Sequence, residues 1–259
     1  MNQTVVVFDI ETSLDRQAFA RATGIAETEI YKIKEALGDV FPKPMFHQIE
    51  CIGVLRAQFH QGAWQIDRFG APHRGDRPEH NLIEGFVRSL EAPLPRLISW
   101  NGTSFDLPVM RLRAMLHQVS APALSARKYF ARYLDDSTDL CDLLASFDSR
   151  SKISLDQVCR AFGIGGKPDD INGSKVQEFV DARQFELISA YCERDVLLTY
   201  LIWLRYELFC GHLSRDGYAA SISDVMAHLE SYGDRKPLLA DLAVSLASAY
   251  SSGTHGIEL

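Results

Sequence analysis

The chain has 259 residues, of which 46% are hydrophobic and 10% aromatic, and its formal net charge is −7 at pH 7. This length fits one large domain or a domain with a small addition, and the apolar content excludes an intrinsically disordered protein. The negative balance argues against a broad basic surface for long duplex nucleic acid, but it allows an enzyme that gathers carboxylates around cations.

The same bulk features bear on location. No apolar run in the sequence reaches the roughly 18 residues needed to cross a membrane, so we expect no membrane association. The first residues carry no basic flank and lead into an apolar run that ends at Asp9, which favours a first strand over a signal peptide. The five cysteines form no CxxC pair, which argues against a zinc site and favours a reducing cytoplasm.

The first predicted elements are strands with a helical insertion. Residues 4–10 are apolar and β-branched, as is typical of a buried central strand. Residues 14–40 are predicted to be helix or loop, with Gly38 as a stop signal. Residues 49–59 and 64–69 are predicted to form two strands of an antiparallel hairpin.

Helices dominate the rest of the chain. The remaining predicted elements are a helix at 79–91, a strand at 97–100, helices at 107–119, 138–147 and 154–162, a loop at 163–174, and a long helix at 185–209. Beyond Gly211 we expect one or two further helices and a polar tail. This order of elements predicts an α/β fold with a mixed sheet flanked by helices.

Two acids, Asp9 and Glu11, directly follow the apolar first strand. Residues two apart on a strand face the same side, so their carboxylates project together, roughly 6–7 Å apart along the strand. Repulsion and desolvation disfavour two charges there unless cations bind between them, and Mg²⁺ or Mn²⁺ prefer such oxygen ligands. A lone pair of acids is more often a solvated strand end, so the pair by itself decides nothing.

A third acid, Asp106, follows the short strand at 97–100 and the turn that begins at Asn101. It is suited to capping a helix that has Pro108 in its first turn. Capping and metal binding are compatible, because one carboxylate oxygen can cap while the other meets a cation.

The long helix at 185–209 carries Tyr191 and Asp195, four residues apart and therefore on one face. A carboxylate on an otherwise apolar helical face needs a partner, because burying it unpaired is costly. That partner could be a nearby arginine, with Tyr191 only packing, or it could be a metal ion.

Together, and in this order, these segments resemble the three exonuclease motifs of the DEDD superfamily in its tyrosine variant. FDIET (8–12) is similar to the first motif, WNGTSFDLPVMRLRA (100–114) to the second, and YCERDVLLTYLIWLR (191–205) to the third. The motifs resemble those of the exonuclease domain of family B DNA polymerases, and of stand-alone bacterial proteins described as polymerase-B-like 3′-5′ exonucleases. The resemblance covers most of residues 4–206.

The resemblance implies a ribonuclease H-like α/β fold, with a mixed five-stranded sheet flanked by helices. It implies two divalent ions, Mg²⁺ or Mn²⁺, whose ligands are Asp9, Glu11, Asp106 and Asp195. An ordinary tyrosine, with a pKa of about 10, is a poor base at neutral pH, so Tyr191 would position the attacking water. We expect the terminal nucleotide to lie against Ile10, Thr12 and Asn101.

The implied activity is metal-dependent hydrolysis of phosphodiester bonds at the 3′ ends of single-stranded DNA or RNA, with DNA favoured. Two alternatives stay open: a non-catalytic nucleic-acid-binding module on the same fold, and an exoribonuclease or oligonucleotidase. The presence of all four acids argues against the first, whereas choice of sugar depends on a contact to the 2′ hydroxyl that the sequence does not place.

The predicted division is an exonuclease domain at 1–210 and a C-terminal helical extension with a polar tail at 211–259. Basic residues such as Arg127 and Lys152 could contact the strand or lie on a solvated surface. Asp139 and Asp142 fit turn or cap roles better than metal binding.

Overall fold

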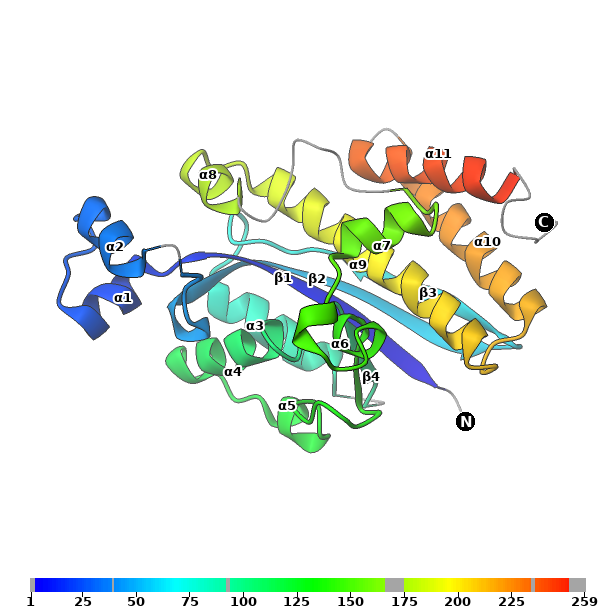
Figure 1. The fold of residues 1–259 in the computed structure, drawn as a ribbon, viewed down its shortest axis with the longest axis horizontal. Coiled ribbons are helices and arrows are strands. Elements are labelled where there is room, and N and C mark those ends of the chain that lie inside the picture. Colours follow the sequence, from blue (N-terminus) through cyan, green and yellow to red (C-terminus); the bar gives the residue numbers. More distant parts are fainter. Residues whose placement is uncertain (1–2, 39, 92–93, 166–174, 234–235, 252–259) are drawn as a thin grey trace.

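A mixed sheet forms the centre of the computed structural model, which describes residues 3–38, 40–91, 94–165, 175–233 and 236–251 (Figure 1). Its strands are β1 (Thr4–Leu14), β2 (His47–His60), β3 (Ala63–Gly70), β4 (Arg96–Ser99) and β5 (Ser137–Asp139). They lie in the order β3-β2-β1-β4-β5, with β1–β2 and β2–β3 antiparallel and β1–β4 and β4–β5 parallel. This topology confirms the predicted five-stranded, ribonuclease H-like sheet.

Helices cover both faces of the sheet (Figure 1). One face packs against α3 (Glu79–Ser89) and α4 (Asp106–Leu116), and the other against α9 (Phe185–Phe209) and α10 (Arg215–Tyr232). The remaining helices are α1 (Arg16–Thr23), α2 (Ile30–Leu37), η1 (Pro44–Phe46), α5 (Pro122–Ala126), α6 (Leu140–Leu144), η2 (Ser149–Ser151), α7 (Leu155–Ala161), α8 (Val176–Asp181) and α11 (Pro237–Ser251). The bounds predicted for the long helix agree with those of α9.

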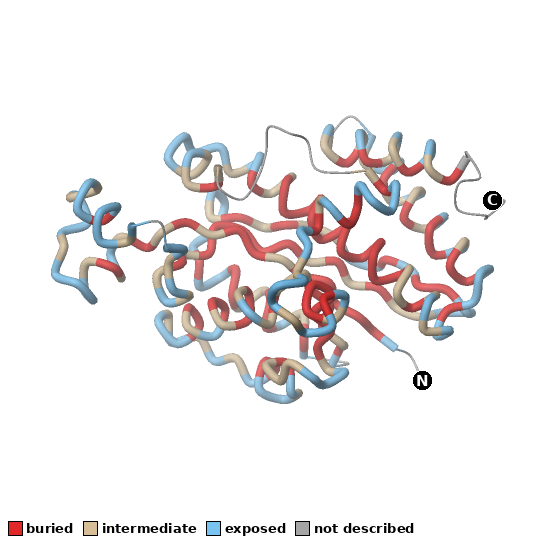
Figure 2. Tube along the Cα trace, viewed as in Figure 1, coloured by how far each residue is buried: buried red, intermediate tan, exposed pale blue. Residues whose placement is uncertain are grey.

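The alternation of side chains along β1 builds the two cores. Val5 and Val7 belong to the cluster that contains α9 and α10, whereas Val6, Phe8 and Ile10 belong to the cluster that contains α3 and α4. Because side chains alternate along a strand, the acids that follow Val7 at every second position lie on the α9 side. Buried residues concentrate on the sheet and on α9, while α1 and α2 project beyond one end of the sheet (Figure 2).

The first strand is longer than predicted. It continues to Leu14 because its last residues pair with the start of β2, after a change of register between Glu11 and Thr12. Such a bulge re-aims the side chains beside it. Asp9 and Glu11 therefore lie within a paired strand and not at a solvated strand end.

The prediction of one helix at 138–147 is wrong in part. Residues Ser137–Asp139 form the edge strand β5, and only Leu140–Leu144 are helical. Three residues are too few to show a strand pattern, and Asp139, the last residue of β5, caps α6 by accepting a hydrogen bond from the Cys141 N–H. The predicted polar tail, and most of the predicted loop at 163–174, lie outside the described residues.

Helix α10 covers the edge of the sheet that is formed by β3. The Trp64 N–H on β3 donates to Ser221 Oγ at 2.9 Å, and the Ile66 N–H donates to Asp224 Oδ2 at 2.8 Å. Satisfying the amides of an edge strand in this way prevents pairing with other chains. Within the described ranges, no helix is both long and apolar enough to span a membrane.

Candidate active site

The two acids of the first motif lie together on β1 beside a thiol of α9. Ligand atoms of Asp9, Glu11 and Cys192 all lie within 4.8 Å of one another. Asp9 is half-buried, and Glu11 is only 7% exposed. Cys192 Sγ lies 3.6 Å from both the carbonyl oxygen and Oδ2 of Asp9. The structure therefore brings the predicted pair together, and it adds Cys192, which the sequence did not single out.

A glycine on β2 allows α9 to approach this closely. Gly53 is the partner of Asp9 in the β1–β2 ladder. A Cβ atom at Gly53 would lie 2.7 Å from Cys192 Sγ and 2.7 Å from a methyl group of Val196, closer than such atoms pack. Burial raises the pKa of the Cys192 thiol well above its usual range, and the neighbouring Cys51, Asp9 and Glu11 raise it further.

The acid of the second motif is joined to the first motif by a hydrogen bond. Asp106 is 4% exposed, and its Oδ1 accepts from the Ile10 N–H at 3.0 Å. The N-cap of α4 is Phe105, so the Asp106 carboxylate turns toward β1 instead of capping its helix. Burial raises the pKa of Asp106 to about 7, and the charge of Asp139 adds to the rise. Ile10 is a predicted substrate-binding residue, but its backbone N–H is already bonded to Asp106.

The third motif lies on the turns of α9 that cross the sheet. Tyr191 is 4% exposed and Asp195 is 7% exposed. Asp195 comes three residues after Cys192, and so is one helical turn away from the thiol that contacts Asp9. The three motifs therefore occupy one region of the molecule; that all four carboxylates bind metal together stays a prediction.

The turn of the second motif is held by Asp139. Asn101 has a positive φ of 64°, and its N–H donates to Asp139 Oδ1 at 2.7 Å. The backbone N–H and the hydroxyl of Thr103 both donate to Asp139 Oδ2. The turn-and-cap role predicted for Asp139 is confirmed, and this carboxylate fixes the loop between β4 and Asp106.

A lysine from a distant loop completes that turn. Lys152 Nζ donates to Asn101 Oδ1 at 2.6 Å and lies 2.8 Å from Asp142 Oδ1. Asp142 is fully buried and also binds Arg132. Lys152 therefore places a positive charge beside Asn101, a predicted substrate-binding residue. The sequence could not distinguish Lys152 from other lysines, because the two partners are 51 positions apart in the chain.

Thr12 is bound to a histidine at the rim of this region. Its hydroxyl and His47 Nδ1 are 2.9 Å apart, and His47 Nε2 lies 3.0 Å from the carbonyl oxygen of Pro42. A carbonyl only accepts, so Nε2 carries the hydrogen, and Nδ1 of the neutral ring accepts from Thr12. Burial lowers the pKa of His47, which favours this neutral form. The ring packs edge-on against Phe105.

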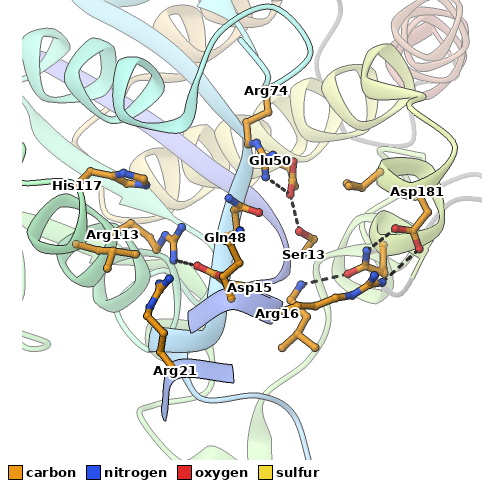
Figure 3. Close-up of a pocket in the computed structure, with 15 residues that line it drawn as sticks. Ser13, Asp15, Arg16, Arg21, Gln48, Glu50, Arg74, Arg113, His117 and Asp181 are labelled. Carbon is orange, nitrogen blue, oxygen red and sulfur yellow. Dashed lines mark hydrogen bonds and ion pairs between the residues drawn. The ribbon is translucent and has the colours of Figure 1, made fainter. Parts of the chain in front are cut away.

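A cavity of about 430 Å³ is lined by the last residues of β1 and by the residues that follow them (Figure 3). It begins at Ser13, two residues beyond Glu11, and its wall includes Arg16, Arg21 and Arg74. Fully buried Glu50 accepts from the Ser13 hydroxyl and from Arg74, and burial raises the pKa of its carboxyl group. The cavity wall therefore combines guanidinium groups with carboxylates, since Arg74 pairs with Glu50 and Arg16 lies 3.7 Å from Asp181.

The chain is similar to a family of predicted exonucleases in sequence and to solved exonucleases in fold. A family model described as "predicted 3'-5' exonuclease related to the exonuclease domain of PolB" matches residues 39–242. No curated protein matches the sequence. A product-bound structure of exonuclease I is similar over 81% of this chain and 48% of its own, with 11% identity and a TM-score of 0.38. An ExoI/SSB-Ct complex is similar over 81% of this chain and 46% of its own, with 10% identity and a TM-score of 0.36. This chain thus spans about half the length of either solved chain.

Proposed function

Since this chain belongs to the family of predicted 3'-5' exonucleases related to the exonuclease domain of PolB, we propose that it removes nucleotides from the 3′ end of single-stranded nucleic acid, with DNA preferred to RNA. The membership agrees with the resemblance of the three motifs. The observation that carries the proposal is the hydrogen bond from Ile10 to Asp106, which draws the second motif to the acids of the first.

The donor set of the proposed site fits hard divalent cations. Carboxylate oxygens dominate it, and oxygen ligands are those that Mg²⁺ and Mn²⁺ prefer. The ligands of the proposed two-ion site are Asp9, Glu11, Asp106 and Asp195. Bound there, two cations would supply an activated water and stabilise the leaving 3′ oxygen. The charge of the cations would also offset the cost of burying Asp106.

The other side chains position the reactants in this proposal. Tyr191, one helical turn before Asp195, holds the attacking water through its hydroxyl. Asn101 is held by Lys152 and Asp139, so its amide presents a fixed polar group to the terminal nucleotide. The ammonium of Lys152 adds positive charge beside the phosphate that is cut. None of these side chains needs to accept a proton.

The cavity beyond Ser13 continues the proposed substrate path. Arg21 in its wall can bind a phosphate of the strand, whereas Arg16 already pairs with Asp181. Thr12 lies between this cavity and the acid pair on β1. We therefore place the 3′-terminal nucleotide at Thr12 and Asn101, with the phosphates of the preceding nucleotides directed toward the cavity.

The test is digestion of matched 5′-labelled single-stranded DNA and RNA ladders with Mg²⁺ or Mn²⁺. We expect stepwise shortening from the 3′ end, faster on DNA, and loss of cleavage in the variants Asp9→Ala and Asp195→Ala. Asp216→Ala is the control, because this exposed acid lies in the first turn of α10. Shortening that persists in the Asp9 and Asp195 variants would refute the assignment.

The role of Tyr191 has its own test. Tyr191→Phe keeps the buried ring but removes the hydroxyl that would hold the attacking water. We expect turnover to fall by about a hundredfold or more, the scale for loss of one group that acts in the transition state. Metal affinity, measured by calorimetry, should change little. Unchanged turnover would remove Tyr191 from the mechanism.

A further inference from the structure

Exposed apolar side chains occur along the segment that runs from α2 to η1. Tyr31, Val40, Phe41 and Met45 are 81%, 75%, 68% and 48% exposed. Single exposed apolar residues are ordinary, but a group of them on one segment indicates a surface that contacts something else. The segment belongs to the insertion between β1 and β2, which projects beyond the sheet (Figure 1).

Phe41 differs from the others because its ring extends an aromatic cluster of the candidate site. The ring centroid of Phe41 lies 4.9 Å from that of His47 and 5.4 Å from that of Phe105. His47 and Phe105 also contact each other, at 4.9 Å. Two rings thus hold Phe41 in place, although more than half of its surface faces solvent.

This cluster adjoins residues of the proposed site. Phe105 directly precedes Asp106, and His47 is hydrogen-bonded to Thr12. Phe41 is the most exposed of the three rings, so the cluster leads outward from the acids to solvent. Phe41 therefore lies at the rim of the site and not on a remote surface.

The charges around Phe41 fit a polyanion with apolar faces. Lys43 is exposed two residues away, and the cavity that begins at Ser13 is lined by Arg21 and by Arg16, which pairs with Asp181. Proteins that bind single strands without regard to sequence combine basic side chains for the backbone with aromatic rings for the bases. A rigidly held phenyl ring beside basic residues has this combination.

We propose that Phe41 is a stacking platform for one unpaired base of the substrate strand, upstream of the bond that is cut. The inference rests on the proposed function. The terminal nucleotide is placed deeper, at Thr12 and Asn101, so the outermost ring meets a base further along the strand. Stacking is tolerant of base identity, which suits an enzyme that digests any sequence.

The test combines a scan of the ligand with a substitution in the protein. The ligands are a series of oligothymidylates. Each carries a single abasic nucleotide, which lacks only the base, at a different position near the 3′ end. Fluorescence anisotropy in EDTA measures binding without turnover. For the protein of natural sequence, we expect the abasic nucleotide at one position to weaken binding by about 5- to 150-fold, the range for loss of one stacked base.

In Phe41→Ala that position should lose its effect, because the base has no ring left to stack on. The two changes then form a double-mutant cycle, and coupling within about twofold of none would overturn the proposal. Phe41→Trp should keep or strengthen the effect. Phe209→Ala is the matched control, an exposed phenylalanine at the far end of α9 that should behave as the natural sequence.

Two further outcomes decide against the proposal. If the terminal abasic nucleotide is the one coupled to Phe41, the ring holds the leaving nucleotide and the upstream placement is wrong. If Phe41→Ala abolishes a dimer in sedimentation velocity and leaves strand binding unchanged, the apolar segment binds a second copy of the chain.

Failure of the proposed function is a separate result. A protein that does not shorten labelled ladders under any metal is not an exonuclease, yet its coupling between Phe41 and one base is still measurable in EDTA. Conversely, a protein that shortens the ladders but shows no coupling keeps the proposed function and loses the stacking platform.

Discussion

Two groups of buried acids lie close to β1, and they are neutralised in different ways. In the first, Arg113 binds Asp15 and Glu79 with all three residues at most 6% exposed. Burial alone would raise the pKa of both carboxyls, but hydrogen bonds and the guanidinium charge of Arg113 hold both values below the usual range. This group is a brace between the start of α1 and the start of α3.

The second group contains Asp106. Its carboxylate receives the Ile10 N–H, and no arginine or lysine forms an ion pair with it among the described residues. Burial raises its pKa to about 7. A protein places a carboxylate in such surroundings at a cost in stability. An acid with its own arginine therefore serves the fold, whereas an acid buried without one is suited to a cation from outside.

The largest expected effect is the loss of activity when the charge of Asp106 is removed. Asp106→Asn keeps the shape and the acceptor for Ile10 but removes the charge. We expect kcat on single-stranded DNA to fall at least about a hundredfold, because changes to the outer partners of metal ligands already cost 10- to 100-fold. The free energy of unfolding, measured in urea without metal, should stay equal or rise. A clear loss of stability with activity retained would make Asp106 a second structural acid.

The converse change is Arg113→Met. Removing one member of a buried ion pair leaves uncompensated charge, here on Asp15 and Glu79, and costs about 3–5 kcal/mol. We expect urea unfolding to show that loss, while kcat per folded molecule at low temperature changes little. Arg150→Met, at a side chain 88% exposed, is the control and should cost no more than about 1 kcal/mol. A catalytic defect without a stability loss would show that Arg113 serves the active site and not the fold.

The sequence predicted most of this architecture because its signals are local. The apolar run before Asp9, the hairpin at 49–69 and the apolar face of α9 all follow from periodicity. The candidate acids could also be predicted from the sequence, because each of the three motifs is a short continuous segment. What could not be predicted depends on distant partners: the pairing of β1 beyond Glu11, the thiol of Cys192 beside Asp9, and the lysine at Asn101. Strand β5 was missed because three residues carry no pattern.

Lys152 offers a middle case, since it pairs with buried Asp142 and also holds Asn101. Lys152→Met should raise KM about tenfold, the equivalent of one charged hydrogen bond of about 1.5 kcal/mol. It should also reduce the dependence of KM on salt, because one positive charge near the phosphate is lost. Arg150→Met is the nearby control. A loss of stability with KM unchanged would place Lys152 with Arg113, as a partner that serves the fold.

The smallest effect concerns stability against pH and uses two carboxyls near the cavity. The pKa of Glu79 is lowered in the folded state, so its contribution is present above its ordinary value of 4.5 and is lost as pH falls. The pKa of Glu50 is raised by burial, so its charge costs stability at neutral pH and acid relieves that cost. Glu79→Gln should therefore flatten the fall in Tm between about pH 6 and pH 3, whereas Glu50→Gln should steepen it. Equal slopes in both variants would mean that Arg113 and Arg74 neutralise their partners equally well.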